Sequence, residues 1–183
     1  MYNWLLTKTH MQSIAGIKIT FFSHTDRKAK EQLFMVKRDD VSQDTVELLK
    51  ECDAGCKMAI DSMEQISKYV SNDKLKTVIE KYNGAHIKME EDIHRLLNSI
   101  GEEDKEPNPI AKASSWIQSE VKMMMNCDSK QAAHLLTDGC NMGIKSIYKY
   151  LNKYDGANND TKDIANNIIS AEQQLRQELR QYL

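Results

Sequence analysis

The sequence predicts an all-α protein, an antiparallel four-helix bundle that is made of two duplicated helical hairpins. The first observation is an internal repeat: residues 55–63 (GCKMAIDSM) recur 84 positions later as residues 139–147 (GCNMGIKSI), with five of the nine residues identical. A second repeat, at an offset of 86, relates the apolar positions of residues 78–97 to those of residues 164–183. Internal similarity of this kind indicates duplicated structural units. Strand signals are nearly absent, so the repeated elements are expected to be helices.

The apolar spacing supports helices as the repeated element. Apolar and small residues recur at every third or fourth position, as they do on the buried stripe of a packed helix. In the first hairpin this stripe consists of Leu49, Cys52, Cys56, Ala59, Met63, Ile66 and Val70. An equivalent stripe runs through residues 133–154 in the duplicate. The predicted long helices are residues 44–70, 73–99, 129–154 and 160–183.

Polar residues and glycine mark the expected helix ends. Asp44, followed three residues later by Glu47, resembles a capping box at the start of the first helix. Gly101 stands where a glycine commonly ends a helix. The acidic, proline-containing residues 102–109 then interrupt the helical pattern, and a short fifth helix is expected at about residues 110–125. Because this stretch separates the two hairpins, it is expected to form a long crossover connection.

Length and composition exclude several classes of function. A chain of 183 residues is expected to form one globular domain, here residues 41–183, after an N-terminal arm at residues 1–40. The formal net charge of −2 provides no basic surface for nucleic acid or anionic lipid. No apolar run approaches the ~20 residues of a membrane span. Four cysteines without a secretory signal indicate free thiols, so we expect a cytoplasmic protein.

The first 34 residues differ from the rest of the chain. They contain all three phenylalanines and match neither hairpin of the repeat. One interpretation is that Met35 is the biological start and that residues 1–34 are upstream sequence translated in frame, since codons for Lys30 and Glu31 can form a bacterial ribosome-binding sequence. The other is a genuine but poorly ordered arm, as chain termini often are.

Two duplicated hairpins joined by a long crossover resemble the ferritin-like fold. More narrowly, the chain is similar to a bacterial ferritin-like family of unknown function that is related to rubrerythrins. The resemblance covers about residues 41–183. It is carried by residues 47–50 (ELLK), residues 53–55 (DAG), Trp116 in the crossover and the repeated residues 138–139 (DG).

The resemblance implies a degenerate di-iron site. Active members of the wider group hold two irons with one Glu from each of two helices and a Glu-x-x-His from each of the other two. The two single Glu positions fall at Cys56 and Cys140 in this chain. The Glu-x-x-His of the second helix falls on residues 83–86 (NGAH), which keep His86 but lack the Glu. Its counterpart on the last helix falls on residues 169–172 (ISAE), which have no His and place Glu172 at the His position. Iron is therefore not expected as a cofactor.

Cys56, His86, Cys140 and Glu172 remain candidate metal residues under an alternative interpretation. Thiolates and imidazole suit zinc or cuprous copper, so the chain could be a soft-metal binding protein. The competing interpretation is that both cysteines pack as small hydrophobic residues, as most buried free cysteines do.

The leading functional interpretation is a non-catalytic bundle without a cofactor that acts as a structural or protein-interaction module. A zinc or copper protein is the alternative, and a di-iron oxidase or peroxidase ranks third. We find no phosphate-binding loop, nucleophile elbow or catalytic triad in the sequence, so it does not indicate an enzyme. The expected partner is another protein or a second copy of the chain, with no nucleic acid and no membrane. The acidic residues 102–106 and the helix around Trp116 are the expected contact surfaces.

Overall fold

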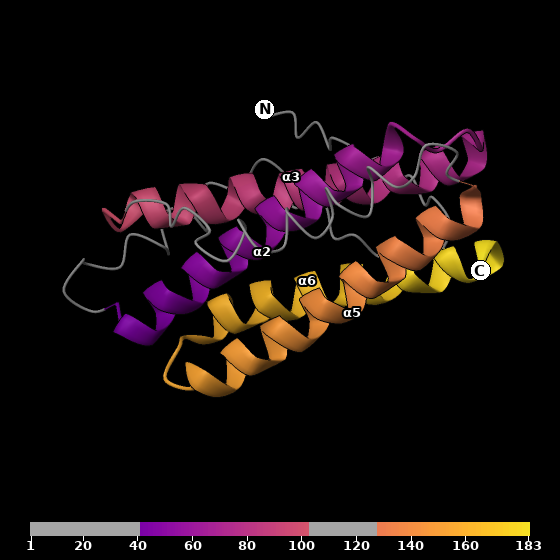
Figure 1. The fold of residues 1–183 in the computed structure, drawn as a ribbon. Coiled ribbons are helices and arrows are strands. Elements are labelled where there is room, and N and C mark those ends of the chain that lie inside the picture. Colours follow the sequence, from indigo (N-terminus) through magenta and orange to yellow (C-terminus); the bar gives the residue numbers. More distant parts are fainter. Residues whose placement is uncertain (1–40, 103–127) are drawn as a thin grey trace, which may run out of the picture. The chain divides into compact units, whose positions relative to one another are not determined.

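The computed structural model describes residues 41–102 and 128–183, which belong to one compact unit of the chain. The described residues form four long α-helices and one short 3₁₀ helix, without any strand (Figure 1). In chain order these are α2 (Gln43–Ser67), α3 (Asp73–Ser99), α5 (Ser129–Lys153), α6 (Asn159–Leu179) and η2 (Arg180–Tyr182). The predicted all-α class with four long helices is confirmed. The predicted arm at residues 1–40 and the predicted fifth helix at residues 110–125 lie outside the described residues.

The helices form two hairpins that pack against each other. A short turn joins α2 to α3 and another joins α5 to α6, so the members of each hairpin run antiparallel, side by side (Figure 1). Between the hairpins, α2 contacts both α5 and α6, and α6 also contacts α3. No described helix carries a stretch long and apolar enough to cross a bilayer.

Each long helix begins at a residue whose side-chain oxygen accepts a backbone N–H of the first turn. These N-cap residues are Ser42, Asn72, Asp128 and Asn158. The predicted cap at Asp44 is therefore wrong. Ser42 has the extended backbone of an N-cap and its Oγ accepts from Thr45 N–H at 3.2 Å, whereas Asp44 lies inside the first helical turn.

The predicted glycine cap at the end of α3 is confirmed. Gly101 has a φ of 76°, in the left-handed region that residues with a Cβ rarely adopt. Its N–H donates to Asn98 O at 3.1 Å, and Glu102 N–H donates to Leu97 O at 3.0 Å. These two bonds form a Schellman motif and satisfy carbonyls that the helix end would leave unpaired.

One end of the bundle is fastened by hydrogen bonds between the hairpins. At the start of α2, Ser42 Oγ donates to Gly156 O at 3.1 Å, and Asp44 Oδ2 accepts from Gly156 N–H at 2.8 Å. Asn158 N–H donates to Thr45 Oγ1 at 2.9 Å. The turn between α5 and α6 therefore lies beside the first residues of α2, so α2 runs antiparallel to α5 and parallel to α6.

The core consists of two apolar clusters. One includes Met63, Ile79, Leu136 and Leu175, and the other includes Leu48, Cys56, Ile93 and Ile168. Both draw side chains from all four helices, so burial of apolar surface holds the two hairpins together. Six of the seven residues in the stripe that the sequence predicts on the first helix are buried: Leu49, Cys52, Cys56, Met63, Ile66 and Val70. The seventh, Ala59, is only partly buried, and Val70 lies just past the end of α2.

Candidate functional site

A histidine and a glutamate meet in the interior of the bundle. His86 comes from α3 and Glu172 from α6, and their exposed fractions are 0% and 6%. His86 Nε2 lies 3.2 Å from Glu172 Oε1. Buried polar groups are costly unless they are paired, so this contact explains how both side chains are accommodated in an otherwise apolar core.

The His86–Glu172 contact requires a hydrogen between the ring nitrogen and the carboxyl oxygen. His86 Nδ1 lies 2.8 Å from the carbonyl oxygen of Tyr82, which can only accept, so Nδ1 carries a hydrogen. The contact between Nε2 and the carboxyl then needs a second proton. Burial lowers the pKa of His86. The hydrogen bond to Glu172, the charge of Glu172 and the hydrogen bond to Tyr82 together raise this pKa by more than burial lowers it, so the net shift is upward. The raised pKa of His86 favours its protonated form, in which one ring nitrogen donates to Tyr82 O and the other to Glu172 Oε1.

Cys140 on α5 joins this polar contact. Burial raises the pKa of its thiol well above the ordinary value, and the charge of Glu172 and a hydrogen bond with that carboxylate raise it further. The thiol therefore stays protonated and donates a hydrogen bond to the carboxylate. Glu172 also packs against the backbone of α5, because a Cβ built at Gly143 would lie 3.3 Å from Glu172 Oε1.

The two cysteines of α2 are also protonated. Burial, followed by the charges of Glu51 and Asp53, raises the pKa of Cys52 to about 12. Burial likewise raises the pKa of Cys56 well above its ordinary value, with smaller contributions from Cys52, Asp53 and Glu172. Both thiols are free and buried. Protonated, enclosed thiols are poor nucleophiles and poor metal ligands.

The structure brings three of the four candidate metal residues together. His86 and Cys140 each bond to Glu172, whereas Cys56 belongs to the other core cluster from Cys140. Within residues 41–102 and 128–183, no group of three or more His, Cys, Asp or Glu side chains is placed to hold a metal ion. His86, Cys140 and Glu172 form a buried hydrogen-bonded cluster.

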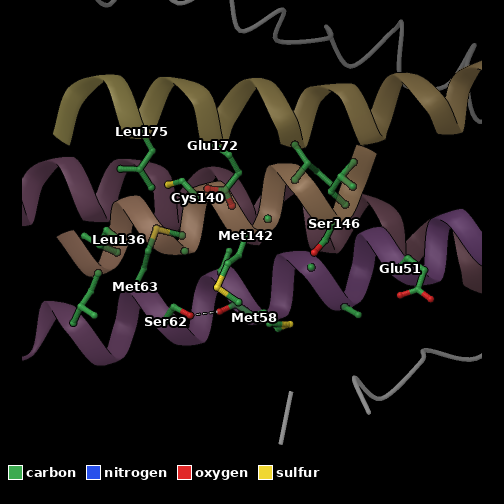
Figure 2. A pocket seen from close by; sticks show the side chains of 18 of the residues that line it. Glu51, Met58, Ser62, Met63, Leu136, Cys140, Met142, Ser146, Glu172 and Leu175 are labelled. Carbon is green, nitrogen blue, oxygen red and sulfur yellow. Dashed lines mark hydrogen bonds between the residues drawn. The ribbon is translucent and has the colours of Figure 1, made fainter. Parts of the chain in front are cut away.

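The surface above this cluster is an apolar groove between α2 and α5 (Figure 2). The groove has a cavity volume of about 430 Å³, and α6 contributes Ile168, Glu172 and Leu175 to its lining. Its walls combine flexible thioethers with residues that have little or no side chain. The thioethers are Met58, Met63 and Met142, and the small residues include Gly55, Ala59, Gly139 and Gly143. Below, these walls and the α6 residues are called the α2/α5 groove.

The groove exists because small residues face each other across two antiparallel helices. A Cβ built at Gly139 would meet no atom within 4 Å, and one at Gly55 would meet only Ile147 Cδ1, at 3.7 Å. The sequence shows these small residues but not the groove, because close helix contact and an open groove leave the same pattern. A volume in this range and an apolar lining are typical of binding sites.

Comparison with known proteins does not extend this description. No protein-family description, no curated protein and no solved structure matches the chain.

Proposed function

We propose that the protein is a non-catalytic, ferritin-like helical bundle that acts as a protein-interaction module, and that the α2/α5 groove is its contact surface. The observation that carries the proposal is the groove itself, an apolar cavity of about 430 Å³ with core residues such as Cys140 and Leu175 in its lining and the 50% exposed Met142 on its rim. Helix-sized apolar grooves with methionine in their walls commonly receive an apolar helix face of a partner.

A contact between equivalent residues supports the duplication. His86 and Glu172 are separated by the repeat offset of 86, and they touch each other. Equivalent residues of two related units meet only close to the two-fold axis that relates them. The contact is therefore what two duplicated hairpins, packed around such an axis, would produce.

The positions of the end of α3 and the start of α5 support the ferritin-like connection. Lys50 Nζ lies 2.7 Å from Glu102 Oε2, so the chain leaves α3 beside the early turns of α2. The turn between α5 and α6 lies at that same end, and α5 therefore begins at the opposite end. Glu102 and Asp128 therefore lie at opposite ends of the bundle, which is what a crossover connection of this type of fold requires.

The chemistry of the cluster argues against a di-iron catalyst. Two of the six positions where the resemblance implies iron ligands are thiols that retain their protons, Cys56 and Cys140. Oxygen-activating di-iron sites depend on several carboxylates, and the one carboxylate at these six positions, Glu172, already bonds to His86 and Cys140. Free thiols of this kind also fit the cytoplasmic location that the sequence predicts.

Photo-crosslinking in living cells tests the interaction function. The photoreactive residue p-benzoylphenylalanine replaces Ser146, an exposed residue of the groove, in the cells that naturally produce the protein. The matched control carries it at Ile87, which is exposed on α3 and does not line the groove. We expect a protein adduct from position 146 that is lost when Gly139→Leu fills the groove, and no equivalent adduct from position 87.

Two results would overturn this proposal. One is the absence of any adduct between chains at position 146. The other is an adduct that persists when Gly139→Leu is present, because contact would then not depend on the groove.

A further inference from the structure

Met142 is an apolar side chain left half in solvent on the rim of the groove. It is 50% exposed, the largest exposed fraction among the large hydrophobic residues that the structure describes. Such a side chain gains free energy when another surface covers it. Its place on α5, within the α2/α5 groove, means that any helix lying in the groove would cover it.

Next to Met142 the same helix has a notch. Gly139 and Gly143 are one helical turn apart on the groove side of α5, and the notch is at Gly139, because Glu172 of the same chain fills the space beside Gly143. A Cβ at Gly139 would meet no atom within 4 Å, so packing inside the chain does not require glycine there. Glycine in the middle of a helix weakens it, and such a residue commonly marks a close approach by another backbone.

The protruding Met142 side chain and the notch lie on the same side of α5, so this surface of one copy can fit against the same surface of a second copy. If a second α5 lies antiparallel across the groove, each Met142 rests over the Gly139–Gly143 turn of the other copy, and both contacts form at once. Such an arrangement is a closed two-fold pair, in which the same patch serves both subunits. A partner of unrelated sequence would need to supply both a protrusion and a notch of its own.

Charges on the flank of α5 favour the antiparallel direction. Asp138 and Lys145 are both exposed, about equally far from the centre of the Gly139–Gly143 turn on either side. An antiparallel second copy brings Asp138 of each chain opposite Lys145 of the other, whereas a parallel copy would place like charges together. Lys149 lies about two turns from the centre, where an antiparallel copy brings it opposite His134 of the other chain and not opposite a second lysine. Lys130 and Lys153 lie about three turns from the centre, where two crossing helices have already diverged.

We propose that two copies of the chain pair through α5, antiparallel about a two-fold axis beside Met142, with each α5 lying in the α2/α5 groove of the other copy. This inference rests on the proposed interaction function and names its partner as a second copy. It assigns Met142 as the residue at the axis and Gly139 as the residue that admits it.

A disulfide at the axis tests the geometry. Met142→Cys is made in a chain that also carries Cys127→Ser, because Cys127 lies outside the described residues and the other three cysteines are buried. Residues at a two-fold axis face their own copies, and mild oxidation should therefore link two chains into a covalent dimer on a non-reducing gel. Ile87→Cys in the same background is the control, because it adds an exposed thiol on α3 and should leave the chains unlinked.

Sedimentation equilibrium tests whether the groove carries the pairing. The wild-type chain should have twice the mass of one chain, and Gly139→Leu should raise the dimer dissociation constant at least tenfold. Gly84→Leu is the matched control: Gly84 is also an exposed glycine in a helix with no atom within 4 Å of a built Cβ, but it lies on α3, away from the groove. Circular dichroism of both variants confirms that they fold.

The two proposals can fail separately. A monomeric wild type, or equal oxidation of the Met142→Cys and Ile87→Cys variants, overturns the second-copy inference. If the photoreactive residue at position 146 then reports a different protein, the interaction function stands with another partner. If it reports only a link within one chain, both proposals are wrong.

Discussion

Cys56 and Cys140 occupy equivalent places in the repeat, but their surroundings differ. Cys140 donates a hydrogen bond to Glu172, whereas Cys56 lies in a cluster of apolar residues that includes Leu48 and Ile93. A hydroxyl placed at Cys140 still has an acceptor beside it. A hydroxyl placed at Cys56 must replace a thiol that packs as a small hydrophobic group.

Alanine and serine should therefore rank in opposite orders at the two cysteines. Cys56→Ala should lower the free energy of unfolding by about 1 kcal/mol, and Cys56→Ser by about 1 kcal/mol more, because the hydroxyl is desolvated without gain. At Cys140, serine should be the milder change, because alanine removes a donor from Glu172. Urea unfolding of the four variants measures the order. The same ranking at both positions would contradict the distinction.

The His86–Glu172 pair should make stability depend on pH. The pKa of His86 is raised above 6.5 in the folded protein, so the folded chain still holds this proton after the unfolded chain has released it. The stabilising contribution is fully present below the unfolded-state pKa and is lost as pH rises through the folded-state pKa. The free energy of unfolding should consequently fall as pH rises from the ordinary histidine pKa of about 6.5 through the raised pKa of the folded state.

Glu172→Gln is the control for the pH dependence. Glutamine keeps the shape of the side chain but removes the charge that raises the pKa of His86. The variant should be less stable than the wild type below neutral pH, and its stability should change less over the same interval. A wild type whose stability rises with pH in this interval would show that His86 is not the imidazolium partner of Glu172.

At the level of single helices, two glycines should respond oppositely to alanine. Gly84 lies inside α3, where a Cβ meets no atom within 4 Å, so alanine should raise the free energy of unfolding by about 0.5–1 kcal/mol. Gly101 ends α3 with a φ of 76°, and alanine there should lower the free energy of unfolding by about 1 kcal/mol. Chemical denaturation of the two variants measures both signs. Destabilisation by Gly84→Ala would contradict the open surface seen around it.

The contact between the start of α2 and the turn before α6 can be tested by removing one oxygen. Thr45 is 3% exposed, and its Oγ1 accepts from Asn158 N–H at 2.9 Å and bonds to Ser42 Oγ. Thr45→Val keeps the shape but leaves these partners unpaired, so it should cost about 1–2 kcal/mol of stability. Thr77→Val is the matched control, since Thr77 Oγ1 bonds only within the exposed first turn of α3, and it should cost less.

Hydrogen exchange locates the effect of Thr45→Val. If the oxygen fastens the hairpins, amides at the start of α6 should exchange faster in the variant. An unchanged exchange pattern together with unchanged stability would mean that the hydrogen bonds at this end do not fasten the hairpins.

At the scale of the whole molecule, apolar periodicity and turn residues were sufficient to predict the helices. The predicted helix at residues 73–99 coincides with α3 (Asp73–Ser99), and Gly101 ends it as expected. The helix start at Asp44 was predicted wrongly because several polar residues near it can cap, and only the path of the backbone selects Ser42. Local sequence determines that a helix starts, and tertiary contacts such as Asp44 with Gly156 determine where.

The site was harder to predict than the fold. The sequence grouped Cys56, His86, Cys140 and Glu172 through the resemblance, but ligand chemistry depends on proton positions, which burial controls and sequence spacing does not show. The α2/α5 groove was not predicted at all. Small residues such as Gly139 permit either close packing or an open surface, and the choice depends on how far apart the two hairpins settle.

The last prediction concerns metal binding by the intact bundle. A metal that bound the folded chain would raise its melting temperature by mass action. Zinc or cuprous copper would need to displace protons from Cys56 and Cys140, whose pKa values are raised by burial, and to separate His86 from Glu172. We therefore expect equal melting temperatures with and without either metal, in the wild type and in the Cys56→Ala and His86→Ala variants alike. A metal-dependent increase in the wild type that both variants lose would establish the soft-metal alternative instead.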